Sequence, residues 1–295
     1  MSAAVNPIAD SRVPAAPRRR GAPVAKGTPF AYLVAIIVIG VTVVPLLFVF
    51  VGGFRTTPAL NADPTATSGP WVWSNYSSIL GSSVFWQFLE NSLLIAVIAT
   101  SVAVGFGSMA SFALSRYNFR LREGFYTLFT IGLLFPIGVA SLPVYLLLRQ
   151  IPPLMENPLG VALPEAAFSL PATVVILRPF MRAIPGELED AAVLDGASRL
   201  GFFWRILLPL SGPALTTVAI LAFVTSWNAY LLPLLVFNDQ NHFTLPLGVA
   251  TFQSQYSQDT ARVLAFTALS MLPALAFLAI AERRIVGGLT GAVKG

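Results

Sequence analysis

Apolar runs without charged residues alternate with short polar segments along most of this chain. Because the hydrocarbon core of a bilayer requires about 20 helical residues, each long run is a candidate membrane span. Five runs meet this requirement: Tyr32–Val51, Ser92–Leu114, Phe125–Leu148, a run within Leu207–Phe237, and Val263–Ala281. The pattern predicts an all-α integral membrane protein.

A weaker sixth run, Asn157–Leu177, is interrupted by Glu165, and the basic residues decide whether it spans. Lys and Arg concentrate in cytosolic loops. Without this span, Arg199 and Arg205 would fall outside. We therefore predict six transmembrane helices with both termini in the cytosol. The outer segments then hold only Arg55, Arg149 and Arg262, and the inner segments hold Arg116, Arg120, Arg122, Arg178, Arg182, Arg199, Arg205, Arg283, Arg284 and Lys294.

The composition agrees with a membrane protein. The chain is 56% hydrophobic and 11% charged, with a mean hydropathy of +0.75, whereas soluble domains carry about 25% charged residues. We predict a disordered cytosolic tail over residues 1–28, a six-helix transmembrane domain over 29–287, and a cytosolic tail over 288–295. A cleaved signal peptide is the alternative for the first segment. The run Tyr32–Val51 is long for a signal core, and no compelling small-residue cleavage site follows it.

Residues that could perform catalysis or bind a metal are scarce. The chain has no cysteine and one histidine, His242, which excludes thiolate sites, a histidine-based triad and multi-histidine metal sites. In its predicted outer loop, we expect His242 to be a solvated side chain rather than a ligand. The phosphate-binding motif G-x-x-x-x-G-K-[ST] is absent from the sequence. We expect no catalytic residue, no metal site and no cofactor bound by this chain, and the basic residues at span ends do not indicate nucleic-acid binding.

The longest charge-rich passage, Pro185–Pro213, lies between the predicted fourth and fifth spans. Gly196 suits the left-handed residue that ends a helix. Ser198 can cap a second helix that runs through Leu208, and Pro209 marks its predicted end. The passage therefore predicts two short helices in water, separated by a break at the glycine. Negatively charged side chains stabilise the first turn of a helix, and the first of these two predicted helices begins with Glu187, Glu189 and Asp190.

The spacing of residues in this passage resembles the EAA loop of ABC importer permeases. The resemblance rests on Asp190-Ala191-Ala192, Gly196, and the later Ile206, Leu208 and Pro209. It implies that residues 185–209 form coupling helices that dock into a groove on a cytosolic ATPase. That family usually has Glu where this chain has Asp190, and an ordinary amphipathic loop is the alternative. The implied coupling residues are Glu189, Asp190, Ala191, Ala192, Asp195, Gly196, Ala197, Ile206, Leu208 and Pro209.

Other passages are similar to the carbohydrate branch of these permeases, of the maltose-permease type. They are Ser115–Arg120, Ala167–Pro171, Ser226–Tyr230, Leu245–Gly248 and Gly288–Gly295. The resemblance implies a permease subunit of a bacterial inner-membrane importer for a sugar or oligosaccharide, working by alternating access. The implied partners are a second permease, which makes a heterodimer, two ATPase subunits that hold ATP and Mg²⁺, and an extracytoplasmic sugar-binding protein. The alternatives are a permease for a polyamine or glycerol phosphate, and an ion-coupled secondary carrier.

Four residues of the predicted fifth span are candidates for contact with a sugar: Thr225, Trp227, Asn228 and Tyr230. Amides and hydroxyls bond sugar hydroxyl groups, and aromatic faces cover the apolar side of the ring. The alternative is that the aromatic rings pack against helices and Asn228 links two helices by a hydrogen bond. For Glu165, we expect the side chain to reach the membrane interface, with a polar pathway as the alternative.

The predicted topology can be tested with a single cysteine, because the chain contains none. A membrane-impermeant maleimide applied to intact cells should leave Ser198→Cys unlabelled and should label it after permeabilisation. Gln240→Cys, in a predicted outer loop, is the control and should be labelled in both conditions. Labelling of Ser198→Cys in intact cells would place the charge-rich passage outside and contradict the topology.

Overall fold

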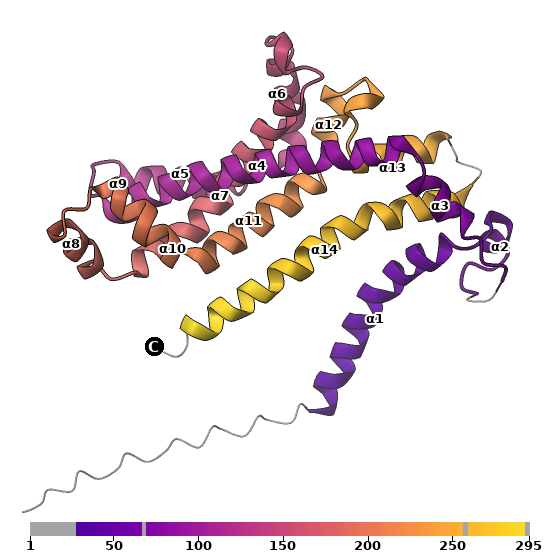
Figure 1. Ribbon diagram of the computed structural model, residues 1–295, viewed down its shortest axis with the longest axis horizontal. Helices are drawn as coiled ribbons and strands as arrows, with labels where there is room; N and C mark the ends of the chain where they lie inside the picture. The colour runs from indigo at the N-terminus through magenta and orange to yellow at the C-terminus, as the bar shows by residue number, and fades with distance from the viewer. Residues whose placement is uncertain (1–27, 67–68, 256–258, 293–295) are drawn as a thin grey trace, which may run out of the picture. The chain divides into compact units, whose positions relative to one another are not determined.

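The computed structural model describes residues 28–66, 69–255 and 259–292, and this part of the chain is helical, without a strand (Figure 1). The predicted tail over residues 1–28 lies, except for Thr28, outside the described residues. The helices are α1 Pro29–Gly52, α2 Thr57–Ala62, α3 Ser74–Leu80, α4 Ser83–Arg116, α5 Arg122–Gly132, α6 Ile137–Leu148, α7 Pro158–Ala183, α8 Glu187–Leu194, α9 Arg199–Phe202, α10 Leu208–Leu210, α11 Gly212–Trp227, α12 Leu231–Val236, α13 Leu245–Gln255 and α14 Thr260–Ala292, with short 3-10 helices at Pro152–Leu154 and Gln240–His242.

The chain divides into two units, one up to Pro45 and one from Leu46 onward. The described part of the first unit is the beginning of α1, a strongly apolar helix of 24 residues that continues into the second unit. At 1.5 Å per residue it is about 36 Å long, enough to cross a bilayer core. The second unit contains all the other helices.

The centre of the second unit is the pair α4 and α7, which pack along one another, and α11 lies against both (Figure 1). Small residues recur at helical spacing on the buried face of α4, where Ala99, Ala103 and Gly107 are all buried. Small side chains let two helices in a membrane approach closely. A Cβ atom at Gly107 would lie 2.4 Å from Cγ2 of Thr173 on α7. The sequence of α4 therefore sets the distance between these helices.

Among the described residues, four helices are long and apolar enough to span a membrane: α1, α4, α7 and the part of α14 up to Ala279. Two bent pairs bring the number to six if each pair is one span, with a bend of 103° between α5 and α6 and of 80° between the segment Arg199–Leu210 and α11. The prediction of one continuous helix over Phe125–Leu148 is therefore wrong, because the helix is interrupted between Gly132 and Ile137. Pro136 has an extended backbone, with φ −73° and ψ 119°, and a proline has no N–H for the helical ladder.

The predicted fifth span is also shorter than the apolar run Leu207–Phe237. Helix α11 has 16 residues, about 24 Å of helix, and the backbone leaves the helix at Asn228 before α12 begins at Leu231. Asn228 and Tyr230 thus lie at a helix break rather than inside a continuous span. At the other end of the chain, α14 continues to Ala292, so most of the predicted tail 288–295 is helical and its last three residues lie outside the described ranges.

The close approach of α4 and α7 predicts that Gly107→Ala destabilises the protein. The new methyl group would meet both Cγ2 and Cβ of Thr173, and a β-carbon cannot rotate away, so the helices must separate. Overpacking of this kind costs about 1–3 kcal/mol. We expect a melting temperature several degrees lower for the purified protein in detergent.

Gly105→Ala is the matched control, because a Cβ atom there has no neighbour within 4 Å and Ala favours a helix by about 1 kcal/mol over Gly. It should leave the melting temperature unchanged or raise it. Equal destabilisation by both substitutions would contradict the proposed packing constraint.

Candidate functional site

The charge-rich passage forms the two short helices that the sequence predicts. Helix α8 ends in a motif in which the N–H of Gly196 donates to the carbonyl of Val193 at 3.0 Å and the N–H of Ala197 to that of Ala192 at 2.8 Å. Gly196 has a φ of +82°, the left-handed conformation that such helix ends require. The predicted glycine break is confirmed.

The second helix begins as predicted but ends later. The hydroxyl of Ser198 accepts a hydrogen bond from the N–H of Gly201 at 3.1 Å, which confirms the cap. After α9, a π-helical turn at Phe203–Leu207 leads into α10, and the helix ends after Leu210. The predicted end at Pro209 is wrong. The π-helical turn ends at Leu207 and α10 begins at Leu208, so Pro209 lies in the first turn of α10. A proline is tolerated there, because the N–H groups of a first turn have no partner within the helix.

One side of this passage is anchored in the protein. Ala192, Phe202, Phe203 and Leu207 are buried in a cluster with side chains of α4, α7 and α11, including Phe112. Phe203 stacks on Phe112 with ring centroids 4.9 Å apart. Among the other implied coupling residues, Ala197, Ile206 and Leu208 pack against the same cluster, Glu189 is half-buried, and Asp190, Ala191, Asp195, Gly196 and Pro209 are exposed.

Other apolar side chains of the passage are exposed. Leu194 at the end of α8 is 88% exposed, and Leu188, Val193 and Leu200 are exposed as well. We call these four residues the apolar edge of the loop. Several large apolar side chains exposed within one short polar segment indicate a candidate docking site for another protein. Ala191 is exposed like these residues, whereas Ala192 is buried in the cluster.

The four sugar-contact candidates do not form one site. Trp227, Asn228 and Tyr230 line a cavity of about 510 Å³ together with residues of α13 and α14, including Ser270. Thr225 lines a separate cavity of about 90 Å³ between α7 and α11. The described residues that line the larger cavity include no Asp, Glu, Lys, Arg or His.

Local contacts show how these candidates are held. Trp227 is buried in a cluster with side chains of α4 and α14, as the packing alternative predicts, and it also stacks on Phe223 of its own helix with centroids 5.6 Å apart. The side-chain amide of Asn228 donates to the carbonyl of Val224 at 2.9 Å, one turn back in its own helix. The expected link from Asn228 to a second helix is therefore wrong.

Glu165 does not reach the membrane interface, so that expectation is also wrong. Its side chain is 2% exposed, and it accepts a hydrogen bond from the hydroxyl of Ser226 on α11. Because α7 begins at Pro158, Glu165 lies about two turns inside the helix, on the face that packs against α11. The second carboxylate oxygen has no hydrogen-bond partner among the described residues.

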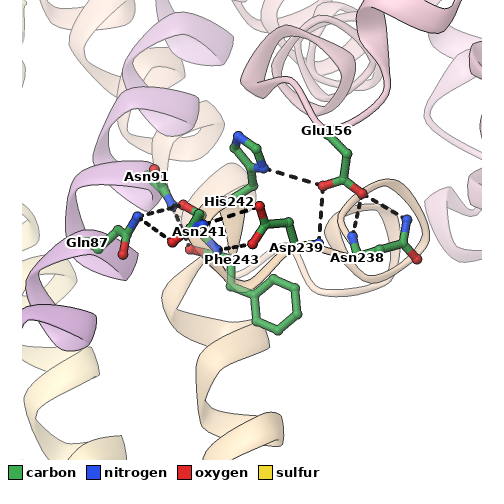
Figure 2. Close-up of polar contacts among 8 residues, drawn as sticks. All are labelled: Gln87, Asn91, Glu156, Asn238, Asp239, Asn241, His242 and Phe243. Carbon is green, nitrogen blue, oxygen red and sulfur yellow. Dashed lines mark hydrogen bonds and ion pairs between the residues drawn. The ribbon is translucent and has the colours of Figure 1, made fainter.

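At one end of the α4–α7 pair, a polar network joins three segments (Figure 2). Glu156, just before α7, accepts hydrogen bonds from the backbone N–H and the side-chain amide of Asn238 at 2.7 and 2.8 Å. The carbonyl of Asn241 accepts hydrogen bonds from Gln87 at 3.2 Å and Asn91 at 2.8 Å, both on α4. The network therefore ties the start of α7 and the loop before α13 to α4.

His242 belongs to this network and is not simply solvated. Its Nδ1 atom lies 3.4 Å from a carboxylate oxygen of Glu156, and its ring stacks on Phe237 with centroids 5.9 Å apart. Burial of Glu156 opposes its ionisation, but the hydrogen bonds from Asn238 and Asp239 and the charge of His242 outweigh burial. The pKa of Glu156 therefore lies below its ordinary value.

The sequence analysis did not predict the contacts of Glu156, or those of Arg116 at the other end of the α4–α7 pair. Glu156 is the only acidic residue between the predicted third and fourth spans, which was a usable signal. Arg116 gave no such signal, because it resembles any basic residue at the end of a span. Its contacts depend on segments far along the chain.

Comparisons with known proteins agree with the resemblance. Residues 103–285 match the family described as binding-protein-dependent transport system inner membrane component. The putative ABC transporter permease protein ORF2 of Caldicellulosiruptor sp. (strain Rt8B.4) is 37% identical over 85% of this chain and 92% of its own length. The trehalose transport system permease protein SugB of Mycobacterium tuberculosis (strain CDC 1551 / Oshkosh) is 35% identical over 88% and 95%.

The fold is likewise similar to a solved structure. A chain of a bacterial ABC transporter involved in the import of the acidic polysaccharide alginate superimposes with a TM-score of 0.72, covering 86% of this chain and 94% of that chain at 21% identity. At this identity the similarity establishes the helical fold.

The polar network predicts a pH dependence of stability. Because folding holds the pKa of Glu156 below its ordinary value of 4.5, its contribution is present above that value and is lost as the pH falls through the pKa of the folded state. As the pH falls below about 5, the melting temperature of the wild-type protein should fall more steeply than that of Glu156→Gln. Parallel pH profiles for the two proteins would show that Glu156 contributes nothing.

Proposed function

We propose a function from one established premise: this chain belongs to the family of binding-protein-dependent transport system inner membrane components. The family consists of multi-pass membrane subunits that transport solutes rather than catalyse reactions. On this premise the chain is a permease subunit of an ATP-driven importer. The observation that carries the proposal is the loop of α8 and α9, because buried side chains anchor it to the helix bundle while the four residues of the apolar edge remain exposed.

The partners follow from this arrangement. The apolar edge, Leu188, Val193, Leu194 and Leu200, is the proposed docking surface for a cytosolic ATPase subunit. Two such subunits hold ATP and Mg²⁺, since this chain is expected to bind neither. A second permease completes a heterodimer in the bacterial inner membrane, and an extracytoplasmic binding protein delivers the solute. The loop and both termini lie in the cytosol in this proposal.

The proposed mechanism is alternating access. Closure of the two ATPase subunits on ATP moves the loop, and the buried aromatic cluster beneath it passes that movement to α4, α7 and α11. The pathway opens outward to receive solute from the binding protein, and ATP hydrolysis returns it to the inward state. Rigid transmission requires a closely packed anchor, which Phe202, Phe203 and Leu207 provide.

The proposed solute is an uncharged sugar or oligosaccharide. One relative is a trehalose transport system permease, and the cavity of about 510 Å³ is lined by Trp227, Asn228 and Tyr230, whose residue types suit a sugar. A polyamine or glycerol phosphate would call for an opposite charge, and the described lining residues carry none. Asn228 and Tyr230, which are both exposed, are thus the favoured contacts, and buried Trp227 and Thr225 of the smaller cavity are weaker ones.

Reconstitution tests the proposed function. Proteoliposomes that contain this chain, its second permease and the ATPase subunits should take up a labelled uncharged oligosaccharide only with ATP, Mg²⁺ and binding protein present. Leu194→Ala should reduce this uptake and weaken retention of the ATPase about tenfold, because full burial of a leucine contributes about 1.5–3 kcal/mol.

Leu121→Ala is the matched control, since Leu121 is also strongly exposed but lies between α4 and α5, outside the loop. It should retain ATPase and transport like the wild-type protein. Uptake driven by an ion gradient without ATP would overturn the proposed function, and equal loss in both variants would overturn the docking surface.

A further inference from the structure

Two arginine side chains link the C-terminal ends of α4 and α7 by reciprocal hydrogen bonds. Arg116, in the last turn of α4, donates hydrogen bonds to the carbonyls of Met181 at 3.0 Å and Ile184 at 2.9 Å, at the end of α7. In return, Arg178 of α7 donates to the carbonyl of Leu114 in α4 at 3.1 Å. Both arginine side chains are almost completely buried.

This exchange joins the two helix ends mechanically. The last carbonyls of a helix have no partner within it, and they carry the negative end of the helix dipole. Each guanidinium group therefore stabilises the end of the other helix with directed, charge-assisted hydrogen bonds. Because the planar guanidinium fixes the directions of its donors, α4 and α7 are held in one arrangement at this end.

Arg116 makes a further set of contacts, and these reach the loop. Its Nε atom lies 3.8 Å from a carboxylate oxygen of Glu189 on α8. Its guanidinium carbon lies 5.8 Å from the ring centroid of Phe202 on α9. One side chain thus contacts α7, α8 and α9 while it belongs to α4. Arg178 turns instead to α5, where it pairs with Glu123 and lies 3.9 Å above the ring of Tyr126.

The apolar cluster beneath the loop cannot by itself determine how α8 moves the helices, because apolar contacts are non-directional. The ion pair between Arg116 and Glu189 instead joins one point on α8 to one point on α4, and it is partly shielded from water, with side chains 8% and 21% exposed. Shielding strengthens the attraction between the two charges. Through this ion pair, a displacement of α8 would displace Arg116. Because Arg116 belongs to α4 and is hydrogen-bonded to the end of α7, the ends of both helices would follow.

We propose that Arg116 is the positioning residue through which movement of α8 reaches α4 and α7 together, with Glu189 as its partner on the loop. This inference rests on the proposed function of the chain as an importer subunit. It assigns Glu189 to the link within this chain, whereas exposed Asp190 faces outward.

The test uses the complete importer in proteoliposomes and measures sugar uptake and ATP hydrolysis in the same sample. Glu189→Gln removes the ion pair and leaves the hydrogen bonds of Arg116 to α7 in place, so it should assemble and fold normally. We expect it to retain ATPase subunits and to hydrolyse at least threefold more ATP per sugar. Arg116→Gln should show at least the same change, and the double variant should be no worse than Arg116→Gln, because both substitutions break one link.

Arg122→Gln is the control, since Arg122 pairs with Glu123 and Asn118 away from the loop; its ATP-to-sugar ratio should equal that of the wild type. A wild-type ratio in Glu189→Gln would overturn the inference, as would loss of the ATPase from that variant, which would make Glu189 a docking contact. Additive effects of the two substitutions would overturn it as well. If the wild-type importer takes up no sugar with ATP, the proposed function fails instead, whatever the variants do.

Discussion

The close contact between α4 and α7 is the constraint on which the rest of this structure depends. Gly107 leaves only enough room for Thr173 to approach the backbone of α4, and α11 packs on the pair that results. Between helices in a membrane, close packing replaces the hydrophobic effect as the source of cohesion. The apolar centre of the pair provides contact over a long surface but does not prevent the helices from sliding.

Polar groups at the two ends of the pair supply the directional contacts. At one end, Glu156 and Asn241 connect the start of α7 and the loop before α13 to α4. At the other end, Arg116 and Arg178 exchange hydrogen bonds between the helix termini. A helix pair that is held at both ends is expected to move as one rigid body.

The breaks in the helices are as important as their packing. The chain bends by 103° between α5 and α6 and leaves the helix between Trp227 and Leu231. Irregular backbone at membrane depth persists only where protein or a cavity satisfies its polar groups. The second break lies beside the cavity that Trp227, Asn228 and Tyr230 line, so the residues at the end of this helix also form part of the cavity wall.

The sequence by itself determined the features that depend on neighbouring residues. The apolar runs, the asymmetry of basic charge, the left-handed Gly196 and the cap at Ser198 all follow from local chemistry. Only the tertiary structure decided which distant groups meet: Ser226 bonds Glu165 from a position 61 residues away, and Arg116 reaches Ile184 over 68 residues. A buried polar side chain must find a partner, but the partner is set by how the helices pack, and no local pattern in the chain specifies that.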